Sequence, residues 1–554
     1  MKRNPFLQGA VVATLGLVIS KVLGILYVIP FYAVIGAQGG ALYGYAYSIY
    51  NIFLNISSIG LPLAMSKITS EYNALGYYDL KERAYYIGKK LIFILSIISF
   101  IILVLFAPNL AHIFIGDIQG GNTLADVTFV IRLVATAILI VPLLSILRGY
   151  LQGHRFITPS ATSQVLEQII RVIIIVVGSY LCIKVFHLPL RIAVGVAIIA
   201  ATIGALFAYY YLKYKIYKNR HHMDDEGITR QTVKVSNKDI FIKLLYYSIP
   251  FVFTSLILSF YHFVDLATIV KVMVNDLKYA VLEAETTISI ILTWGSKLNM
   301  IVMAIATGLT TSMIPNITRS FVKKDLPDFR QKVNRSIQLL FFIAMPMTIG
   351  LSLLAEPIWT VFYGHSDVGT IVFRYSIMVA LIGSLSVILN VILNSLNKYK
   401  KLFVYTFTGF IIKTVFTVPL MYSFHALGLH ASYGAITATI FGYFSSIFLI
   451  LRFLKVEYQV KYEETFKRII NMILAVIIMS IVIILLQFII PVNTSNRIMA
   501  LLLISFYSII GFLIYLIMMI KNKLLFQVFG YHFIEKILTR LKLNKIINVN
   551  KYNK

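Results

Sequence analysis

Long apolar stretches alternate with short polar connections along almost the whole chain. Each stretch is close to or above the roughly 20 residues that an α-helix needs to cross a bilayer. The pattern predicts an all-α polytopic membrane protein with 14 transmembrane helices, because helices satisfy their own backbone groups inside lipid. The predicted spans are residues 6–35, 42–70, 88–107, 127–150, 158–183, 190–214, 240–271, 285–315, 335–360, 369–396, 402–424, 430–453, 467–490 and 497–520.

The spans form two similar halves. The second span ends in GLPLAM at residues 60–65, and the eighth ends in GLTTSM at residues 308–313. Halves of six spans share one orientation and are related by a pseudo-two-fold axis along the membrane normal, as in transporters whose substrate path lies between the halves. The predicted organisation is an N-terminal six-helix bundle at 1–215, a cytoplasmic linker at 216–239, a C-terminal six-helix bundle at 240–455, transmembrane helices 13 and 14 at 456–520, and a basic amphipathic cytoplasmic tail at 521–554.

Composition agrees with this class, and charge predicts the orientation. Hydrophobic residues make up 59% of the chain and charged residues only 13%, which excludes an ordinary soluble domain. The formal net charge of +28 would suggest nucleic acid, but the basic residues gather in connections after even-numbered spans, such as 213–243 and 319–335. The positive-inside rule then places both termini in the cytoplasm, so we expect a multi-pass protein of the cell membrane and no nucleic-acid partner.

The sequence lacks the common motifs of covalent chemistry. It has one cysteine, Cys182, and no phosphate-binding loop, no nucleophile elbow and no HExxH zinc motif. We therefore expect no enzyme activity, no cofactor and no metal site.

Eight ionisable residues of the predicted spans are interpreted as intramembrane charges. They are Lys21, Arg132, Glu167, Arg171, Asp265, Lys297, Arg374 and Lys413. Charges at this depth ordinarily face a protein interior or a wet cavity, and the excess of positive charge favours an anionic ligand. Glu167 and Arg171 are four residues apart and could simply pair on one helix, which is the favoured interpretation for them. Lys21 and Lys297 have no acid nearby in the sequence.

The surroundings of Lys21 also point to a packed interior. Gly16, Ser20 and Gly24 repeat every fourth residue and would allow a close helix contact. Lys21 is too far from either end of its span to reach the interface, and burial there costs at least about 2.5 kcal/mol.

Polar residues on the second span are further candidates for a binding site. Asn51 and Asn55 suit a phosphate or sugar head group, but they could equally hydrogen-bond between helices.

Taken together, these residues resemble the MurJ-like lipid II flippases of the multidrug/oligosaccharidyl-lipid/polysaccharide (MOP) exporter superfamily. The resemblance extends over the whole chain, and the order and spacing of its motifs carry it. The motifs are SKVLG at 20–24, Asn51, GLP at 60–62, RGYLQG at 148–153 with Glu167 and Arg171, and WGSKL at 294–298.

The resemblance implies a 14-helix flippase that moves an undecaprenyl-pyrophosphate-linked peptidoglycan precursor outward by alternating access, with membrane lipids and cell-wall synthases as neighbours. The family's cavity cations match Lys21 and Lys297, which implies that both bind the pyrophosphate. Ser20, Gly24, Asn51 and Asn55 would lie beside them. The better-known branch has further arginines at the positions of Tyr27 and about Asn55, so its phosphate contacts do not carry over whole.

Energy coupling is a further expectation. The family implies a sodium site with an acid late in the seventh helix, and Asp265 matches that acid. The eleventh span carries Lys413 and no acid, which leads to the hypothesis that Lys413 replaces sodium by pairing with Asp265 and that the membrane potential drives transport. Alternatively, Lys413 neutralises another acid such as Glu167, or faces water.

Three alternatives for the function stay open. They are a flippase for another lipid-linked oligosaccharide (teichoic, capsular or spore-related), a multidrug/cation antiporter of the same superfamily, and a scaffold for cell-wall enzymes. A drug-cation antiporter would need acids in the cleft, whereas Lys21 and Lys297 favour a flippase.

Overall fold

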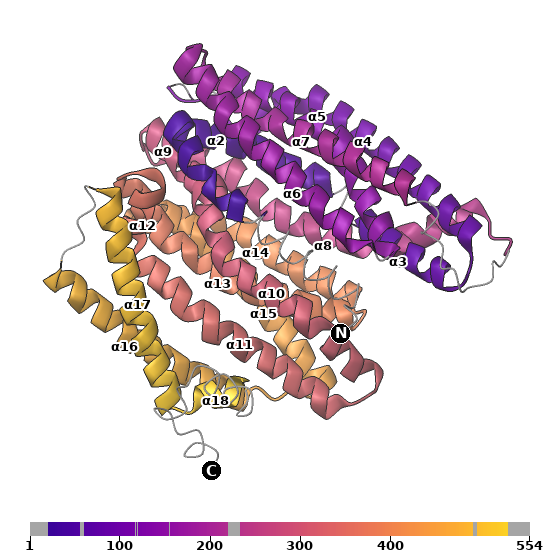
Figure 1. Ribbon diagram of the computed structural model, residues 1–554. Helices are drawn as coiled ribbons and strands as arrows, with labels where there is room; N and C mark the ends of the chain where they lie inside the picture. The colour runs from indigo at the N-terminus through magenta and orange to yellow at the C-terminus, as the bar shows by residue number, and fades with distance from the viewer. Residues whose placement is uncertain are drawn as a thin grey trace. The chain divides into compact units, whose positions relative to one another are not determined.

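A computed structural model describes residues 20, 22–55, 60–116, 118, 120–154, 156–219, 233–490 and 496–529 (Figure 1). All secondary structure within those ranges is helical. The longer helices are α2 (Val28–Leu54), α3 (Gly60–Ala74), α4 (Tyr78–Ile115), α5 (Leu124–Gly153), α6 (Ile157–Ile173), α7 (Leu190–Lys218), α8 (Asn237–Lys271), α10 (Gly295–Val322), α11 (Leu326–Leu353), α13 (Asp367–Ser395), α14 (Tyr399–Ala426), α15 (Ser432–Tyr458), α16 (Glu463–Ile489) and α17 (Arg497–Lys521). The shorter ones are α9 (Val281–Ser289), α12 (Ala355–Tyr363), α18 (Leu524–Phe529) and the π-helical turns η2 (Ile174–Gly178), η3 (Leu181–Val185), η5 (Val272–Asp276) and η6 (Ile290–Trp294).

The predicted class of fold is confirmed. Within the described residues, 13 helical spans are long and apolar enough to cross a membrane. The first two predicted spans, 6–35 and 42–70, lie partly outside the described residues, and Val22–Leu54 is counted there as one span. It consists of helices that meet at a kink at Gly36, whose φ of 63° and ψ of −165° are not helical. Glycine adopts this conformation without steric cost, so the predicted turn after residue 35 becomes a sharp bend.

The chain forms two compact units, residues 1–297 and 298–554. In the first unit, α5 lies beside α4 and α7, and α6 packs on α7 (Figure 1). Helix α2 contacts α5, α7, α8 and α9 within the same unit. The sequence-based division at the linker 216–239 stays a prediction, and residues 220–232 of that linker lie outside the described residues.

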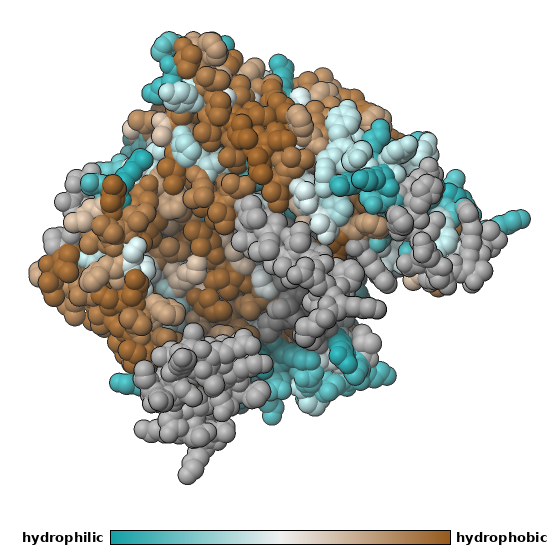
Figure 2. Space-filling view, in the orientation of Figure 1, coloured by the Kyte–Doolittle hydropathy of each residue, from teal (hydrophilic) through white to brown (hydrophobic). Residues whose placement is uncertain are grey.

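In the second unit, α13 packs against α11 and α15, and α14 packs against α15. Helix α16 lies between α11 and α17, while α17 also contacts α12 and α18. Figure 2 shows hydrophobic residues over the visible faces of α16 and α17, and the exposed side chains there include Phe466, Leu474, Phe488 and Phe512. Such faces suit contact with lipid. Most of the predicted amphipathic tail, residues 530–554, lies outside the described residues.

Helix α2 and the π-helical turn η6, near the end of the first unit, pack closely against each other. The Thr293 hydroxyl donates a hydrogen bond of 3.0 Å to the backbone oxygen of Gly40. A Cβ on Gly40 would lie 2.0 Å from Nε1 of Trp294, and one on Gly44 would lie 2.8 Å from the Thr293 hydroxyl. Glycines four residues apart therefore let η6 approach the α2 backbone. Lys297 is three residues after Trp294, which is less than one helical turn. The contact between α2 and η6 therefore also constrains the position of Lys297.

Substituting Gly40 tests this contact. Gly40→Ala should cost about 1–3 kcal/mol, because the new methyl group overlaps the Trp294 ring. Gly383→Ala in α13 is the matched control, since its nearest neighbours would lie 3.9 and 4.0 Å from the added Cβ. The measurement is the midpoint of thermal unfolding of the purified protein in detergent. Equal midpoints for the two variants would show that η6 does not depend on Gly40.

Candidate functional site

Lys297 lies in an aromatic environment within the first unit. Its side chain is half-buried, and its ammonium is 5.7 Å from the centroid of the Tyr27 ring, within cation–π range. Phe31 packs between Tyr27 and Tyr43, with ring centroids 6.0 and 5.5 Å from theirs. Tyr27 and Tyr43 are buried, so the aromatic side of this site is packed and the ammonium does not lie against lipid.

Three further charges meet between α5 and α6. Glu167 accepts a hydrogen bond of 2.6 Å from Arg171, the pair that their four-residue spacing predicts. The other carboxylate oxygen of Glu167 accepts one of 2.9 Å from Arg148 on α5. Arg148 also donates to the Ser163 hydroxyl at 2.9 Å. Two guanidinium groups therefore share one carboxylate, and the group of three carries one positive charge in excess.

Arg171 connects this group to the site around Lys297. A terminal nitrogen of its guanidinium donates to the Tyr47 hydroxyl at 3.2 Å. Tyr47 stacks on Tyr43 with ring centroids 5.1 Å apart, so a row of aromatic rings leads from Arg171 to the Tyr27 ring beside Lys297. We call Arg148, Glu167, Arg171 and Lys297 the cationic cluster; its net charge is +2, from three positive groups and one negative.

Only part of the first predicted span lies within the described residues. Lys21 lies outside the described residues, so its predicted role stays a prediction. The Ser20 hydroxyl is buried and has no hydrogen-bond partner among the residues that the structure describes. A Cβ on Gly24 would lie 3.5 Å from Nε2 of Gln168, which places this part of the helix next to α6.

The two asparagines of α2 differ in their surroundings. Asn55 donates hydrogen bonds to the Ser259 hydroxyl at 2.6 Å and to the Ser255 backbone oxygen at 3.2 Å, so it joins its helix to α8. Asn51 is exposed. In this structure, the inter-helix interpretation describes Asn55, and a substrate contact stays a prediction for both residues.

The proposed coupling residues lie in different units. Asp265 in α8 belongs to the first unit and is 5% exposed. Lys413 in α14 belongs to the second, is fully buried and donates a hydrogen bond of 2.5 Å to the Thr439 hydroxyl on α15. Their pairing stays a prediction.

Sequence reasoning missed a buried acid, Glu285 in α9. It is 2% exposed, and its carboxylate accepts a hydrogen bond of 2.6 Å from the backbone N–H of Asn122. The Asn122 side chain in turn donates to the backbone oxygen of Gln38 at 3.0 Å. A Cβ on Gly121 would lie 2.6 Å from this carboxylate, so glycine is needed there. Glu285 is the first residue of the predicted eighth span, where a carboxylate is ordinarily expected to face water.

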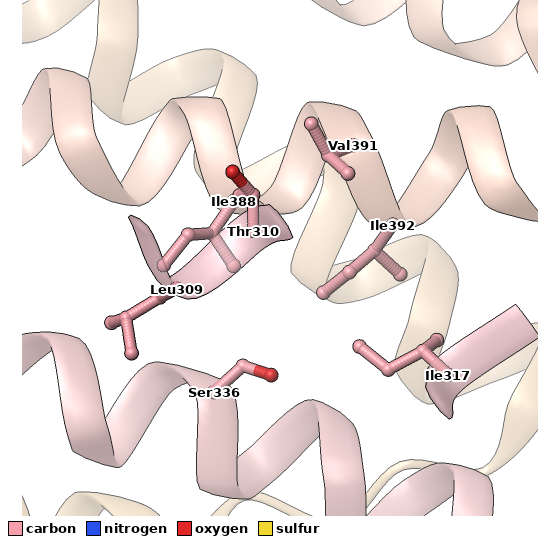
Figure 3. Close-up of a pocket in the computed structure, with 7 residues that line it drawn as sticks. All are labelled: Leu309, Thr310, Ile317, Ser336, Ile388, Val391 and Ile392. Carbon is pink, nitrogen blue, oxygen red and sulfur yellow. The ribbon is translucent and has the colours of Figure 1, made fainter. Parts of the chain in front are cut away.

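Two hollows occur in the second unit. Figure 3 shows Thr310, Ser336 and five aliphatic side chains around a pocket between α10, α11 and α13. The space of about 10 Å³ fits no more than one water, and both hydroxyls already donate to backbone oxygens of their own helices. The larger hollow is an apolar groove of about 410 Å³ lined by α11, α12, α16 and α17. Its walls include Ile343, Met347, Ile483 and Phe512, which suit a hydrocarbon chain and not a charged group.

The described residues contain no group of three His, Cys, Asp or Glu side chains arranged to hold a metal ion. The cationic cluster offers guanidinium and ammonium donors beside aromatic rings, a combination that suits a negatively charged ligand.

Comparison with known proteins gives consistent matches. Residues 6–321 match the family described as polysaccharide biosynthesis protein. The chain is 35% identical over 494 residues to the lipid II flippase MurJ of Bacillus subtilis (strain 168), covering 88% of this chain and 89% of the relative. It is 25% identical to the stage V sporulation protein B of the same organism, over 66% of this chain and 68% of the relative.

Two solved structures share the fold. One is a lipid II flippase MurJ in an inward closed conformation, with a TM-score of 0.62 and 16% identity, over 93% of this chain and 99% of that one. The other is an inward-facing multidrug resistance MATE transporter of the MOP superfamily, with a TM-score of 0.61 and 13% identity, over 81% of this chain and 98% of that one.

Proposed function

Because this chain belongs to the MurJ family of lipid II flippases, within the polysaccharide biosynthesis proteins, we propose that it carries lipid II from the cytoplasmic to the outer leaflet by alternating access. The match to the Bacillus subtilis flippase over nearly the full length of both chains is the observation that carries the proposal. Transport of this kind makes and breaks no covalent bond, so the protein needs to bind and release the substrate and to change conformation.

The cationic cluster supports binding of the pyrophosphate group. Lys297 offers a point charge, and phosphate is held well by such an ammonium. We assign Lys297 and Lys21 as the two lysines that bind the pyrophosphate, with Ser20, Gly24, Asn51 and Asn55 as neighbours of that site. The buried rings of Tyr27 and Tyr43 shield part of the half-buried Lys297 side chain from water, which strengthens its attraction for an anion.

The groove in the second unit supports a place for the lipid tail. Its apolar walls come from α11, α12, α16 and α17, and the outer faces of α16 and α17 are hydrophobic as well. An isoprenoid chain could therefore stay in an apolar environment while the charged head group is moved.

A flippase for another lipid-linked glycan is the second candidate. The match to the family described as polysaccharide biosynthesis protein supports it, because that description names no single glycan. The likeness to MATE transporters concerns the fold alone, and a net charge of +2 in the cationic cluster disfavours a cationic drug as substrate. We further propose that enzymes which synthesise or polymerise cell-wall precursors work beside this protein.

Removing either lysine tests the binding site. Lys297→Ala and Lys21→Ala should each lower the rate of lipid II flipping in proteoliposomes at least tenfold, and arginine at either position should keep part of the rate, because it keeps the charge. Lys323→Ala, at an exposed lysine just beyond α10, is the control and should flip at the wild-type rate. Full activity of both alanine variants would show that the pyrophosphate is bound elsewhere.

The orientation that we propose places both termini in the cytoplasm. A topology reporter inserted after Ala37 or within residues 120–122 should then read out as extracytoplasmic, and one within residues 223–229 as cytoplasmic. The readout is the activity of paired reporters, one active only outside the cytoplasm and one only inside. Opposite signals at these positions would reverse the direction of transport drawn from the charge pattern.

A further inference from the structure

Glu285 in α9 is a buried acid to which the proposed function gives no role. Its side chain is 2% exposed, and one carboxylate oxygen, Oε1, accepts a hydrogen bond of 2.6 Å from the backbone N–H of Asn122. The other oxygen, Oε2, is buried and has no hydrogen-bond partner within the described part of the chain. None of the ion pairs among the described residues includes Glu285. A buried carboxylate without a cation is costly, so packing alone does not explain its presence here.

The connection between α4 and α5 approaches Glu285 closely. Gly120 has a φ of 98°, a left-handed conformation that favours glycine. A Cβ on Gly121 would lie 2.6 Å from both the carboxyl carbon and Oε1 of Glu285. The bend and the absence of a side chain therefore bring the backbone of Asn122 directly onto the carboxylate.

Asn122 extends this contact to a third segment. Its side chain donates a hydrogen bond of 3.0 Å to the backbone oxygen of Gln38 in α2, and α2 itself packs against α9. The two hydrogen bonds of Asn122 therefore hold the connection against both helices. Only the bond to Glu285 changes in strength with charge, because a hydrogen bond to an ionised carboxylate is roughly twice as strong as one to a neutral acceptor.

The titratable groups around Glu285 supply no counter-ion in this structure. They are Tyr45 on α2, Asp126 on α5, Lys271 on α8 and Asp276 on η5. The Tyr45 hydroxyl is buried and has no hydrogen-bond partner among the residues that the structure describes. Asp126 is itself negative and pairs with Arg191 at 3.7 Å. Lys271 lies beside Gly116, and Asp276 is exposed. A proton is therefore the ligand that removes the charge of Glu285 without moving another side chain.

We infer that Glu285 is a proton-binding site: its ionised form holds Asn122 and the connection after α4 against α9, and a proton on Oε2 releases them. The proton comes from water, the new bond is the O–H bond at Oε2, and the interaction that weakens is the hydrogen bond from Asn122. The direction of the effect rests on the proposed function and its orientation, in which this connection lies outside the cytoplasm. An acidic exterior then loosens the contact on the side where the substrate leaves.

Hydrogen–deuterium exchange of the purified full-length protein in lipid nanodiscs tests the site, because the N–H of Asn122 is itself the donor. Mass spectrometry follows peptides that contain Asn122 between about pH 8 and about pH 4.5, a range that ends near the ordinary titration of a glutamate. Each rate is divided by the intrinsic exchange rate at that pH. The protection of Asn122 should fall about tenfold as the pH falls, because the neutral carboxyl is the weaker acceptor.

Glu285→Gln separates this carboxyl from the other acids of the protein. The amide has nearly the same shape and is neutral at every pH, so exchange at Asn122 should be fast throughout and independent of pH. Asp276→Asn, at an exposed acid of η5, is the matched control and should behave as the wild type does. Thermal unfolding checks that each variant is folded. Wild-type protection that stays constant with pH, or an unchanged pH dependence in Glu285→Gln, would overturn the proton site.

A flipping assay distinguishes failure of the proton site from failure of the proposed function. Proteoliposomes with an acidic solution at the extracytoplasmic face should flip lipid II faster than those at neutral pH, and Glu285→Gln should lose that difference. If exchange at Asn122 depends on pH as expected but the wild-type protein does not flip lipid II, the proposed function fails and the proton site stands. If lipid II is flipped while exchange does not respond to pH, the proton site fails and the proposed function stands.

Discussion

A charge buried among apolar helices is costly unless another group compensates it. The ion pairs of Glu167 with Arg148 and Arg171 are the constraint on which the interior of the first unit depends. Removing one partner of a buried ion pair costs about 3–5 kcal/mol, because the other charge is then left uncompensated. Arg148 comes from α5, Arg171 and Glu167 from α6, and Tyr47 from α2. The Glu167 carboxylate thus joins α5 to α6, Arg171 extends the contact to α2, and one positive charge is left in excess.

Close helix packing then brings Lys297 next to that excess. Gly40 and Gly44 let the π-helical turn η6 lie directly against the α2 backbone, where Thr293 bonds the Gly40 oxygen at 3.0 Å. π-Helical turns are frequent at functional sites, since the extra residue redirects the side chains that follow. Lys297 follows the end of η6 by three residues, and its ammonium lies 5.7 Å from the centroid of the Tyr27 ring. The site is therefore a product of backbone approach as much as of charge.

Sequence reasoning could predict the local features and not those that arise from distant segments. Apolar stretches of membrane-spanning length predict the helices, because lipid leaves the backbone few other choices. The pair of Glu167 and Arg171 follows from spacing on one helix. Its third member, Arg148, stands near the end of a predicted span and joins the pair only when α5 and α6 meet.

Two other residues show the same limit. Asn55 could have faced substrate or another helix, and only the arrangement of α8 decides that it bonds Ser259. Glu285 lies at the boundary of a predicted span. Its carboxylate is buried because the distant connection around Asn122 covers it, and the sequence next to Glu285 does not predict that contact. The kink at Gly36, where two helices meet, lies within the predicted connection between the first two spans.

Depletion of the protein in its source cell tests the central claim most directly. The measurement is the amount of each undecaprenyl-linked intermediate in the inner and outer leaflets as the protein disappears. The account predicts that lipid II accumulates in the inner leaflet and is lost from the outer one. Accumulation of a different lipid-linked glycan, with lipid II reaching the outer leaflet at its normal level, would contradict it.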